Sequence, residues 1–469
     1  MSHPLRIAVV GHTNTGKTSL MRTLLRDTEF GEVSDRPAVT REVEGAPLLA
    51  QGRVAAELYD TPGLEDSIAL LDHLEKLRGD RRTEGVDVID QFLKSPAAEG
   101  HFSQEAKALR QVLQSDVALY VIDARDRVLG KHRDELTVLA MCARPVVPVL
   151  NFTAPGNVMG AGVAGWREQL ARCGLHAVAE FDTVVLADQG EQRLFETMRT
   201  LLPGHRQAID ALIEDRQQQR DRLITAASNA IADLLLDASA YCVSVPHGDT
   251  AQMREATDNL KSLVRGREQQ CVEQLLELFR FHRDEYTADD LPLTDGQWGL
   301  DLFSPAALKQ FGIRAGGGAA AGAVAGLAVD AMVGGLALGT ATAAGAAIGA
   351  LLGTGRTHGR RLLDRLKGRT ELRCDDATIR LLEARQVALT RALLRRGHAA
   401  QQPVEVKQDS SLRRSRLPEA IQQARLTPSW SRLGESVALS GLAEAARERA
   451  QSSLAETIQQ SIKQSGTGQ

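Results

Sequence analysis

The sequence predicts an α/β domain with a parallel-rich sheet, followed by an all-α region that contains a glycine- and alanine-rich helical hairpin. Three observations lead to this prediction. Short apolar runs alternate with amphipathic stretches as far as about residue 203, helical periodicity dominates after that residue, and residues 315–353 are almost free of charge. We therefore divide the chain into residues 1–203, 204–310, 311–355 and 356–469.

Five apolar runs are the expected strands of the first domain. Each is short, and amphipathic stretches separate the runs, which is typical of strands joined by crossover helices. Leucine and isoleucine then recur at intervals of three and four residues between about residues 204 and 297, which predicts helices there. The expected strands are Ile7–Val10, Ala55–Tyr59, Val117–Ile122, Val146–Leu150 and Val184–Leu186.

The segment GHTNTGKT, from Gly11 to Thr18, matches the pattern G-x-x-x-x-G-K-[ST] at every fixed position. It follows the first expected strand and precedes an amphipathic helix, which is the context that a phosphate-binding P-loop requires. Its glycines let backbone amides approach a phosphate, Lys17 reaches the β- and γ-phosphates, and the Thr18 hydroxyl binds Mg²⁺. The expected nucleotide-binding residues are Gly11, His12, Thr13, Asn14, Thr15, Gly16, Lys17, Thr18 and Ser19.

Two further segments extend this site. In LYDTPG a strand ends in Asp60, which can hold the metal ion, and the amide of Gly63 can sense a γ-phosphate. The polar loop before this strand contains Thr40, whose hydroxyl is placed to complete the metal shell. An ordinary turn and an ordinary surface threonine are the alternative interpretations. The expected metal ligands are Thr18, Thr40 and Asp60, and the expected catalytic residues are Lys17, Thr40 and Gly63.

Together, GHTNTGKT, VTRE and DTPG resemble the TrmE, Era and EngA branch of translation-factor-related GTPases. The resemblance implies GTP hydrolysis with Mg²⁺, and it gives Asn14 the role of holding K⁺ beside the phosphates. Leu64 stands where Ras-like enzymes keep a water-orienting glutamine. A leucine cannot orient water, so we expect slow hydrolysis that needs a cation, a group in trans or a homodimer formed through this domain.

A longer run of motifs, which continues to PVLNF, resembles a proteobacterial family of GTPase-like proteins with an uncharacterised C-terminal domain. The resemblance covers the first two hundred residues well. It implies a GTPase domain joined to a second region of unknown role.

The base-recognition segment departs from the family pattern. An Asn-Lys-x-Asp segment is expected after Leu150, because its aspartate accepts hydrogen bonds from guanine N1 and N2, but the chain has Asn151-Phe-Thr-Ala154. Asn151 remains available for the base, whereas the main discriminator between guanine and adenine is missing. An ATPase or a promiscuous NTPase therefore stays open as an alternative. Asp188 is a candidate substitute for the missing carboxylate, with a solvated loop aspartate as the commoner interpretation.

Three other polar residues are expected to be structural. Asp123 ends a strand, but the metal role already belongs to Asp60. His12 and His132 have no partner in the sequence pattern, so we expect polar loop residues rather than catalysts.

Besides the phosphate-binding motifs, residues 315–353 form a second segment whose composition is informative. They contain almost only small and apolar residues, with Asp330 as the one charged residue. Their glycines recur every fourth residue, a glycine-zipper pattern that lets helices approach closely in lipid. Two helices joined near Asp330 would each be close to the minimum length for a membrane span. A soluble, tightly packed hairpin is the alternative. Basic residues flank the segment, as the positive-inside tendency requires: Lys309, Arg314, Arg356, Arg360 and Arg361.

The composition limits the partners. The 56 basic and 60 acidic residues among 469 nearly balance, so we expect no specific nucleic-acid partner. The five cysteines stand singly, which is typical of a reducing cytosol. The N-terminus lacks the pattern of a secretory signal, which predicts a cytoplasmic start.

The resulting hypothesis is a slow GTP-operated switch that binds guanine nucleotide and associates with the inner membrane from the cytoplasmic side. Its other expected partner is membrane lipid or a membrane protein. A non-enzymatic, nucleotide-stabilised membrane scaffold is the alternative.

Overall fold

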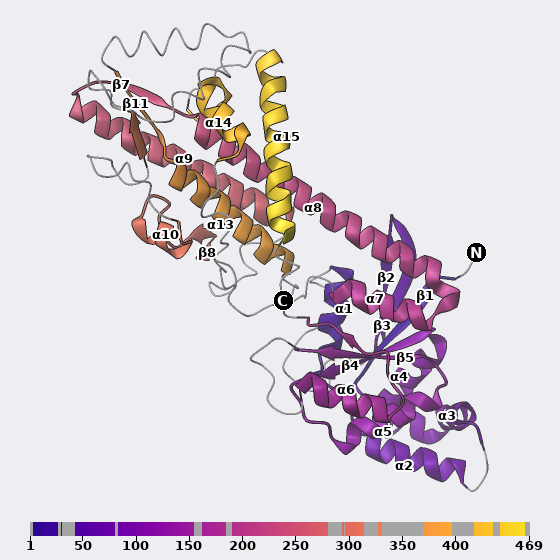
Figure 1. Ribbon diagram of the computed structural model, residues 1–469. Helices are drawn as coiled ribbons and strands as arrows, with labels where there is room; N and C mark the ends of the chain where they lie inside the picture. Colours follow the sequence, from indigo (N-terminus) through magenta and orange to yellow (C-terminus); the bar gives the residue numbers. More distant parts are fainter. Residues whose placement is uncertain are drawn as a thin grey trace. The chain divides into compact units, whose positions relative to one another are not determined.

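The structure is a computed structural model. It describes residues 3–26, 30, 43–79, 83–153, 162–183, 190–279, 293–294, 296–313, 327–330, 369–395, 417–434 and 441–464. Two compact units divide the chain, and the boundary between them falls between Asp221 and Arg222 (Figure 1).

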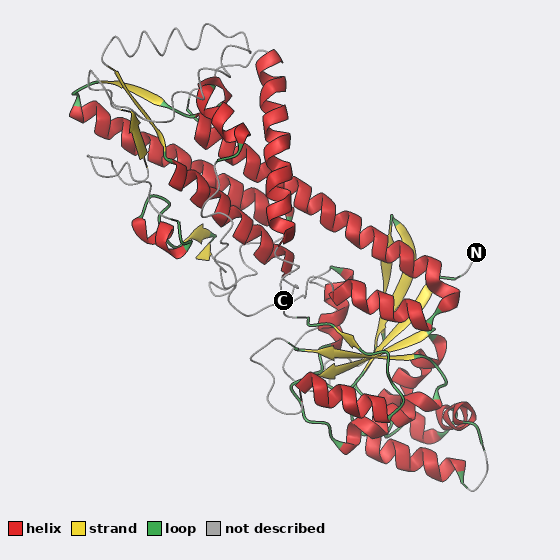
Figure 2. Cartoon of the chain, in the orientation of Figure 1, coloured by secondary structure: helices red, strands yellow, loops and turns green. Residues whose placement is uncertain are grey.

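The first unit is built on a sheet, whose strands Figure 2 shows in yellow. The described strands of this sheet follow the order β2-β3-β1-β4-β5-β6. Strand β2 is antiparallel to β3, and all other neighbouring strands are parallel. The predicted parallel-rich α/β sheet is therefore confirmed. The strands are β1 (Leu5–Val10), β2 (Glu44–Ala50), β3 (Arg53–Asp60), β4 (Val117–Asp123), β5 (Val146–Asn151) and β6 (Ala179–Glu180).

Two strands differ from the sequence-based expectation. Strand β2 was not expected, because its sequence EGAPLLA contains glycine and proline and only two of its residues are buried, as at a sheet edge. The last described strand of the sheet is β6, at Ala179–Glu180. The expected strand Val184–Leu186 lies outside the described residues.

Both faces of this sheet are buried beneath helices. Along β1, Ala8 and Val10 belong to one hydrophobic cluster, whereas Ile7 and Val9 belong to the other. This alternation is the two-residue period of a strand, and burial on both faces is typical of a parallel sheet. The helices are α1 (Lys17–Leu25), α2 (Ser67–Arg78), α3 (Gly85–Leu93), η1 (Pro96–Ala98), α4 (Ser103–Gln114), α5 (Gly130–Met141), α6 (Gly162–Arg172), α7 (Gly190–Leu201) and η2 (Pro203–His205).

Helix α8 (Arg206–Ala240) continues from the first unit into the second. Its N-terminal half packs on the first unit through side-chain hydrogen bonds. The Arg216 guanidinium donates to the Leu24 carbonyl at 3.1 Å, and Arg26 donates to the Gln219 side chain at 2.6 Å. The first unit therefore includes the residues of α8 as far as Asp221.

The second unit is mainly helical, as predicted for the region after the first domain (Figure 2). It also holds a small antiparallel sheet in the order β10-β11-β7 and a two-stranded hairpin of β8 and β9. Its described elements, besides the end of α8, are β7 (Val243–Pro246), α9 (Thr250–Leu278), β8 (Leu293–Thr294), β9 (Gln297–Trp298), α10 (Pro305–Gln310), β10 (Leu327–Asp330), β11 (Arg369–Cys374), α13 (Asp376–Arg395), α14 (Glu419–Leu426), η6 (Pro428–Trp430) and α15 (Gly441–Gln464).

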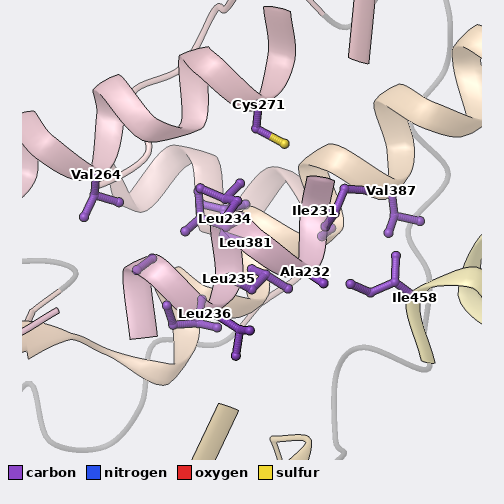
Figure 3. Packing of buried hydrophobic residues seen from close by; sticks show 14 of the residues in the cluster. Ile231, Ala232, Leu234, Leu235, Leu236, Val264, Cys271, Leu381, Val387 and Ile458 are labelled. Carbon is purple, nitrogen blue, oxygen red and sulfur yellow. The ribbon is translucent and has the colours of Figure 1, made fainter. Parts of the chain in front are cut away.

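One hydrophobic cluster forms the core of this unit (Figure 3). Leu234 of α8, Cys271 of α9, Leu381 of α13 and Ile458 of α15 are fully buried members. Burial raises the pKa of the Cys271 thiol to about 12, so this cysteine stays neutral and packs as a small apolar residue.

A group of buried charges joins three helices of the second unit. Asp237 of α8 is 1% exposed and accepts from Arg267 of α9 and Arg447 of α15, each at 2.9 Å. Asp233, one turn earlier, also pairs with Arg267 at 3.0 Å and with Arg447 at 2.7 Å. The Arg432 amide adds a third hydrogen bond to Asp237 at 3.1 Å. We call these five residues the aspartate–arginine cluster.

The glycine- and alanine-rich segment contains one described stretch, and its structure corrects the expectation. Leu327–Asp330 forms strand β10, which pairs antiparallel with β11 from Leu327 opposite Cys374 to Asp330 opposite Glu371. The expected helix is therefore wrong at Leu327–Val329, and Asp330, which was expected at the turn of the hairpin, ends a strand instead. The neighbouring strand satisfies their backbone groups, a long-range contact that glycine periodicity does not signal. The rest of 315–353 lies outside the described residues.

Within the described part of the chain, one helical stretch is long and apolar enough to cross a membrane. It is Pro203–Ala240, and 67% of its most apolar window is buried inside the protein. That burial is typical of a core helix, so length and hydropathy give only weak support for a span.

Candidate functional site

The loop Gly11–Gly16 connects β1 to α1 at the end of the central strand. Gly11 has φ 149°, and a Cβ atom there would meet the Val121 carbonyl at 2.5 Å. Gly16 has φ 89°, and a Cβ atom there would collide with the Asn151 side chain. Only glycine fits either position, because both the backbone conformation and the space exclude a side chain. The loop therefore curls tightly before the N-terminus of α1.

Lys17 is buried, with 7% exposure, and its ammonium lies over this loop. It donates to the Gly11 carbonyl at 3.3 Å and to the His12 carbonyl at 2.8 Å. Burial lowers the pKa of Lys17, against the opposing charges of Asp60 and Glu135. A cation that only carbonyl dipoles and more distant carboxylates balance favours an anionic ligand at this position.

Thr18 and Asp60 meet at the start of α1. The Thr18 hydroxyl donates to Asp60 Oδ2 at 2.6 Å. Asp60 is 2% exposed, and its Oδ1 atom has no hydrogen-bond partner among the described residues. Burial is the main cause that raises the pKa of Asp60, although the Thr18 hydrogen bond opposes it. A buried carboxylate oxygen without a partner beside a hydroxyl is a donor set that fits Mg²⁺.

Two residues predicted near this site cannot be placed. Thr40, the third expected metal ligand, and Asp188, the candidate substitute carboxylate, both lie outside the described residues. Their assigned roles stay predictions. Asn14 is described, and it lies exposed in the loop with φ 64°. Ser19 belongs to the first turn of α1, where its carbonyl accepts from Thr23 at 2.9 Å.

The segment after Asp60 packs directly on the phosphate loop. A Cβ atom on Gly63 would meet the Thr13 hydroxyl at 2.5 Å and the Thr13 amide nitrogen at 3.0 Å. The next residue, Leu64, donates its amide to the Gly11 carbonyl at 3.2 Å, and its side chain is buried in the core at 1% exposure. Leu64 thus faces the interior. The Thr13 hydroxyl donates to Glu65 at 2.9 Å, so the exposed carboxylate after Leu64 lies at the loop.

His12 has a partner that the sequence did not reveal. Its Nδ1 atom lies 3.0 Å from Glu135 Oε1 and 3.0 Å from the Leu64 carbonyl. Glu135 of α5 is fully buried, and Tyr120 of β4 donates to its other oxygen at 2.6 Å. Burial, and then the charge of Glu135, hold the pKa of Tyr120 well above its ordinary value. The expectation that His12 lacks a partner is therefore corrected.

A weak sequence signal for Glu135 existed. Glu135 shares the helical spacing of Val138, Leu139 and Cys142, which are all buried core residues. A charged residue on the apolar face of a helix needs a partner. His132 lies on the same helix, and its Nδ1 accepts from the Leu129 amide at 3.1 Å, where it caps the start of α5.

At the other end of the site, Asn151 binds protein rather than standing free for a base. It is fully buried and donates to the Thr15 carbonyl at 3.0 Å. Its oxygen accepts from the Phe152 amide at 2.9 Å, and from the amide and hydroxyl of Thr183 at 2.9 and 3.1 Å. Asn151 therefore ties the phosphate loop to the ends of β5 and β6. Thr183 was not predicted, because Asp188 was the candidate site residue of this stretch.

Phe152 occupies the position at which the family pattern has lysine. Its backbone has φ 56°, and its ring Cζ lies 3.2 Å from the position of a Cβ atom on Gly16. The Arg125 guanidinium lies 4.1 Å from the centre of the ring. Asp123 holds that guanidinium through contacts of 2.9 and 2.6 Å. The predicted structural role of Asp123 is therefore to position Arg125.

Family models match most of the chain. Residues 6–152 match the family described as "50S ribosome-binding GTPase", and residues 167–458 match the family described as "Domain of unknown function (DUF3482)". The first match covers the phosphate loop, Asp60 and Asn151. The second match covers 292 of the 469 residues, which is 62% of the chain.

Curated relatives are similar over part of their length. The tRNA modification GTPase MnmE of Synechococcus elongatus is 27% identical over 257 residues, which are 51% of this chain and 51% of that protein. GTPase Der of Jannaschia sp. is 30% identical over 225 residues, which are 47% of this chain and 38% of Der. The chain thus spans about half the length, or less, of these relatives.

Among solved structures, Era of Aquifex aeolicus aligns with 38% of this chain and 50% of its own, at 21% identity and a TM-score of 0.26.

Proposed function

The chain belongs to the family that shares the domain of unknown function DUF3482, and its first unit is a P-loop GTPase domain of the TrmE, Era and EngA type; from this premise we propose that it is a slow, Mg²⁺-dependent GTP switch associated with the membrane. Guanine-nucleotide binding and GTP hydrolysis are general properties of such domains. The rate, the metal, the membrane and the effect on a partner are the proposed parts.

One observation carries the proposal. At the end of β1, the buried Lys17 ammonium, the Thr18 hydroxyl and a buried Asp60 oxygen without a described partner converge on one tightly curled glycine loop. A protein interior tolerates a buried carboxylate oxygen without a partner when a ligand or an ion completes it. A triphosphate supplies the anion for Lys17 and for the amides at the N-terminus of α1.

Thr18 and Asp60 are the described residues that would hold Mg²⁺. Bound there, the ion would supply positive charge that offsets the negative charge developing on the phosphates during hydrolysis. Gly63 lies against Thr13, so the segment after Asp60 is close enough to respond to the γ-phosphate. That response is the switch element of the proposal.

We expect slow hydrolysis because the residue after Gly63 is not a water-orienting side chain. Leu64 is buried and has no polar side-chain atom, so it cannot position the attacking water. An exposed Asn14 with φ 64° supports the proposal that K⁺ assists there. A homodimer formed through the first unit is the other proposed source of the missing group.

The membrane part of the proposal rests on sequence. Residues 331–353, which follow β10, contain no charged residue, and Arg356, Arg360 and Arg361 follow them. An apolar segment of this length can associate with a bilayer, and the pairing of β10 with β11 keeps both ends of the intervening segment on the same side of it. Basic flanks favour the cytoplasmic face and anionic lipid. Deletion of 331–353 should release the protein from the membrane fraction. Unchanged fractionation of a folded deletion variant would remove this part of the proposal.

Calorimetry tests the nucleotide part. We expect GTP and GDP to bind the purified full chain in Mg²⁺, turnover to be slow, and K⁺ to raise the turnover above its value in Na⁺. Lys17→Ala is the matched control, because it keeps the fold and removes the phosphate contact. Binding of ATP at least as tight as that of GTP would instead support the alternative of a promiscuous NTPase.

A further inference from the structure

We propose that the nucleoside end of this site is a stacking platform, in which the Phe152 ring, backed by the Arg125 guanidinium, contacts a purine nucleoside and holds it with little discrimination between guanine and adenine. This inference rests on the proposed function, because it concerns the same bound nucleotide.

The first step is the position of the ring. Phe152 Cζ and Cε2 are 3.2 and 3.5 Å from the position of a Cβ atom on Gly16, the last glycine of the phosphate loop. Asn151 also binds the Thr15 carbonyl of that loop. The ring therefore lies beside the phosphate loop and is partly exposed. A nucleoside that extends from phosphates bound to this loop toward the end of β5 passes it.

The second step is that the ring is held in place. The left-handed conformation of Phe152 is costly for a residue with a side chain, and it persists only where the surroundings over-determine it. Asn151 Oδ1 accepts the Phe152 amide, and Arg125 lies over the ring at 4.1 Å. Asp123 fixes Arg125 through both carboxylate oxygens, and Asp123 is the neighbour of Asn151 in the parallel register of β4 and β5.

The third step is the chemistry of the platform. A lysine and an aspartate would read guanine by hydrogen bonds, whereas the chain has Phe152 and Ala154 at those positions. Every base has a π face, so stacking on an aromatic ring contributes affinity without choosing a base. The Arg125 guanidinium contacts the ring through a cation–π interaction and so helps to hold it. The site would thus contact the face of the base by stacking, instead of reading the edge of the base by hydrogen bonds.

The test compares three ligands, GTP, ATP and inorganic tripolyphosphate, each with Mg²⁺, on the full chain and on two variants. Phe152→Leu keeps an apolar side chain against Gly16 but removes the π face, and Phe152→Tyr keeps the ring. We expect Phe152→Leu to weaken GTP and ATP alike, by about fivefold or more, which is the lower end for a base–aromatic contact. Tripolyphosphate should bind the wild type and both variants equally, and Phe152→Tyr should bind all three ligands like the wild type.

We expect the wild-type preference for GTP over ATP to fall far below the about 10⁴-fold that a hydrogen-bonding site provides. A preference of that size would overturn the inference. Equal binding of GTP by the wild type and Phe152→Leu would also overturn it, as would a loss confined to GTP. A parallel loss of tripolyphosphate would show that Phe152 supports the phosphate loop instead. If a folded wild type binds none of the three ligands, the proposed function fails, and the inference fails with it.

Discussion

Asp60 in the first unit and Asp237 in the second are both buried carboxylates, with 2% and 1% exposure, but their surroundings differ. Asp60 accepts one hydroxyl, and its Oδ1 has no partner within the described part of the chain. Asp237 accepts from two guanidinium groups and a backbone amide in the aspartate–arginine cluster.

Buried charges therefore serve two different purposes in this protein. A matched cluster of charges fixes helices against one another, and removal of one member leaves the others uncompensated. An unmatched carboxylate lowers the stability of the empty protein, and a cation or ligand offsets that cost when it binds. We therefore expect substitutions in the aspartate–arginine cluster to change stability, and substitutions at the phosphate loop to change nucleotide binding.

The largest expected effect is on stability. Asp237→Ala leaves Arg267 and Arg447 without one carboxylate, which should lower the free energy of unfolding of the second unit by about 3–5 kcal/mol. Hydrogen exchange of α9 and α15 measures the change where it occurs. Asp237→Asn, which keeps an acceptor oxygen, should lose less. Tripolyphosphate affinity should stay at the wild-type value, and a parallel loss of that affinity would contradict the separation of stability from binding.

Lys17→Ala should have the converse effect. Removal of one partner of a buried charge contact costs about 2–5 kcal/mol of binding, so GTP affinity should fall about 30-fold or more. The melting temperature of the ligand-free protein should change little, because the cost of burying the ammonium offsets its hydrogen bonds to the Gly11 and His12 carbonyls. Calorimetry and thermal unfolding on the same samples measure both quantities. A Lys17→Ala variant with a lower melting temperature and a normal affinity for GTP would contradict this expectation.

Gly63→Ala tests the packing of the segment after Asp60. The added methyl group would meet Thr13, and overpacking of this kind costs about 1–3 kcal/mol. We expect a lower melting temperature together with weaker GTP binding, because the phosphate loop must shift. Thr13→Gly in the same chain removes the closest atom and should restore part of both. If the second substitution restores nothing, the contact with Thr13 is not the cause.

The smallest expected effect is a pH dependence. Burial raises the pKa of Asp60, so its carboxyl takes up a proton at a higher pH than an ordinary aspartate, whose pKa is about 3.9. Mg²⁺-dependent GTP binding should therefore weaken as the pH falls toward that raised pKa. The stability of the ligand-free protein has the opposite sign: the charged carboxylate lowers it at neutral pH, and protonation restores it as the pH falls.

Asp60→Asn is the control for this titration. Its GTP affinity should be low at every pH and should lack the same transition. If binding to the wild type and to Asp60→Asn falls in parallel as the pH is lowered, another group controls the titration.

Contiguous features were predictable, and long-range ones were not. The phosphate loop, Asp60 and most of the strands each lie in one short segment whose pattern carries the signal. The pair of His12 with Glu135 joins residues 123 positions apart, and the local pattern marks Glu135 as in need of a partner without indicating His12. Leu327–Val329 of strand β10 were expected as helix, because alanine favours a helix and the local pattern carries no sign of a partner strand such as β11.

Helix α8 has a practical consequence for dividing the protein. A fragment that stops at residue 203 would lack the partners of Leu24 and Arg26, which lie at the end of the helix that begins with Lys17. It would also lack Asp215, which accepts the Gln51 amide at 3.0 Å. Expression of the nucleotide-binding half alone should therefore succeed better with a stop codon after Asp221 than with one at the end of α7.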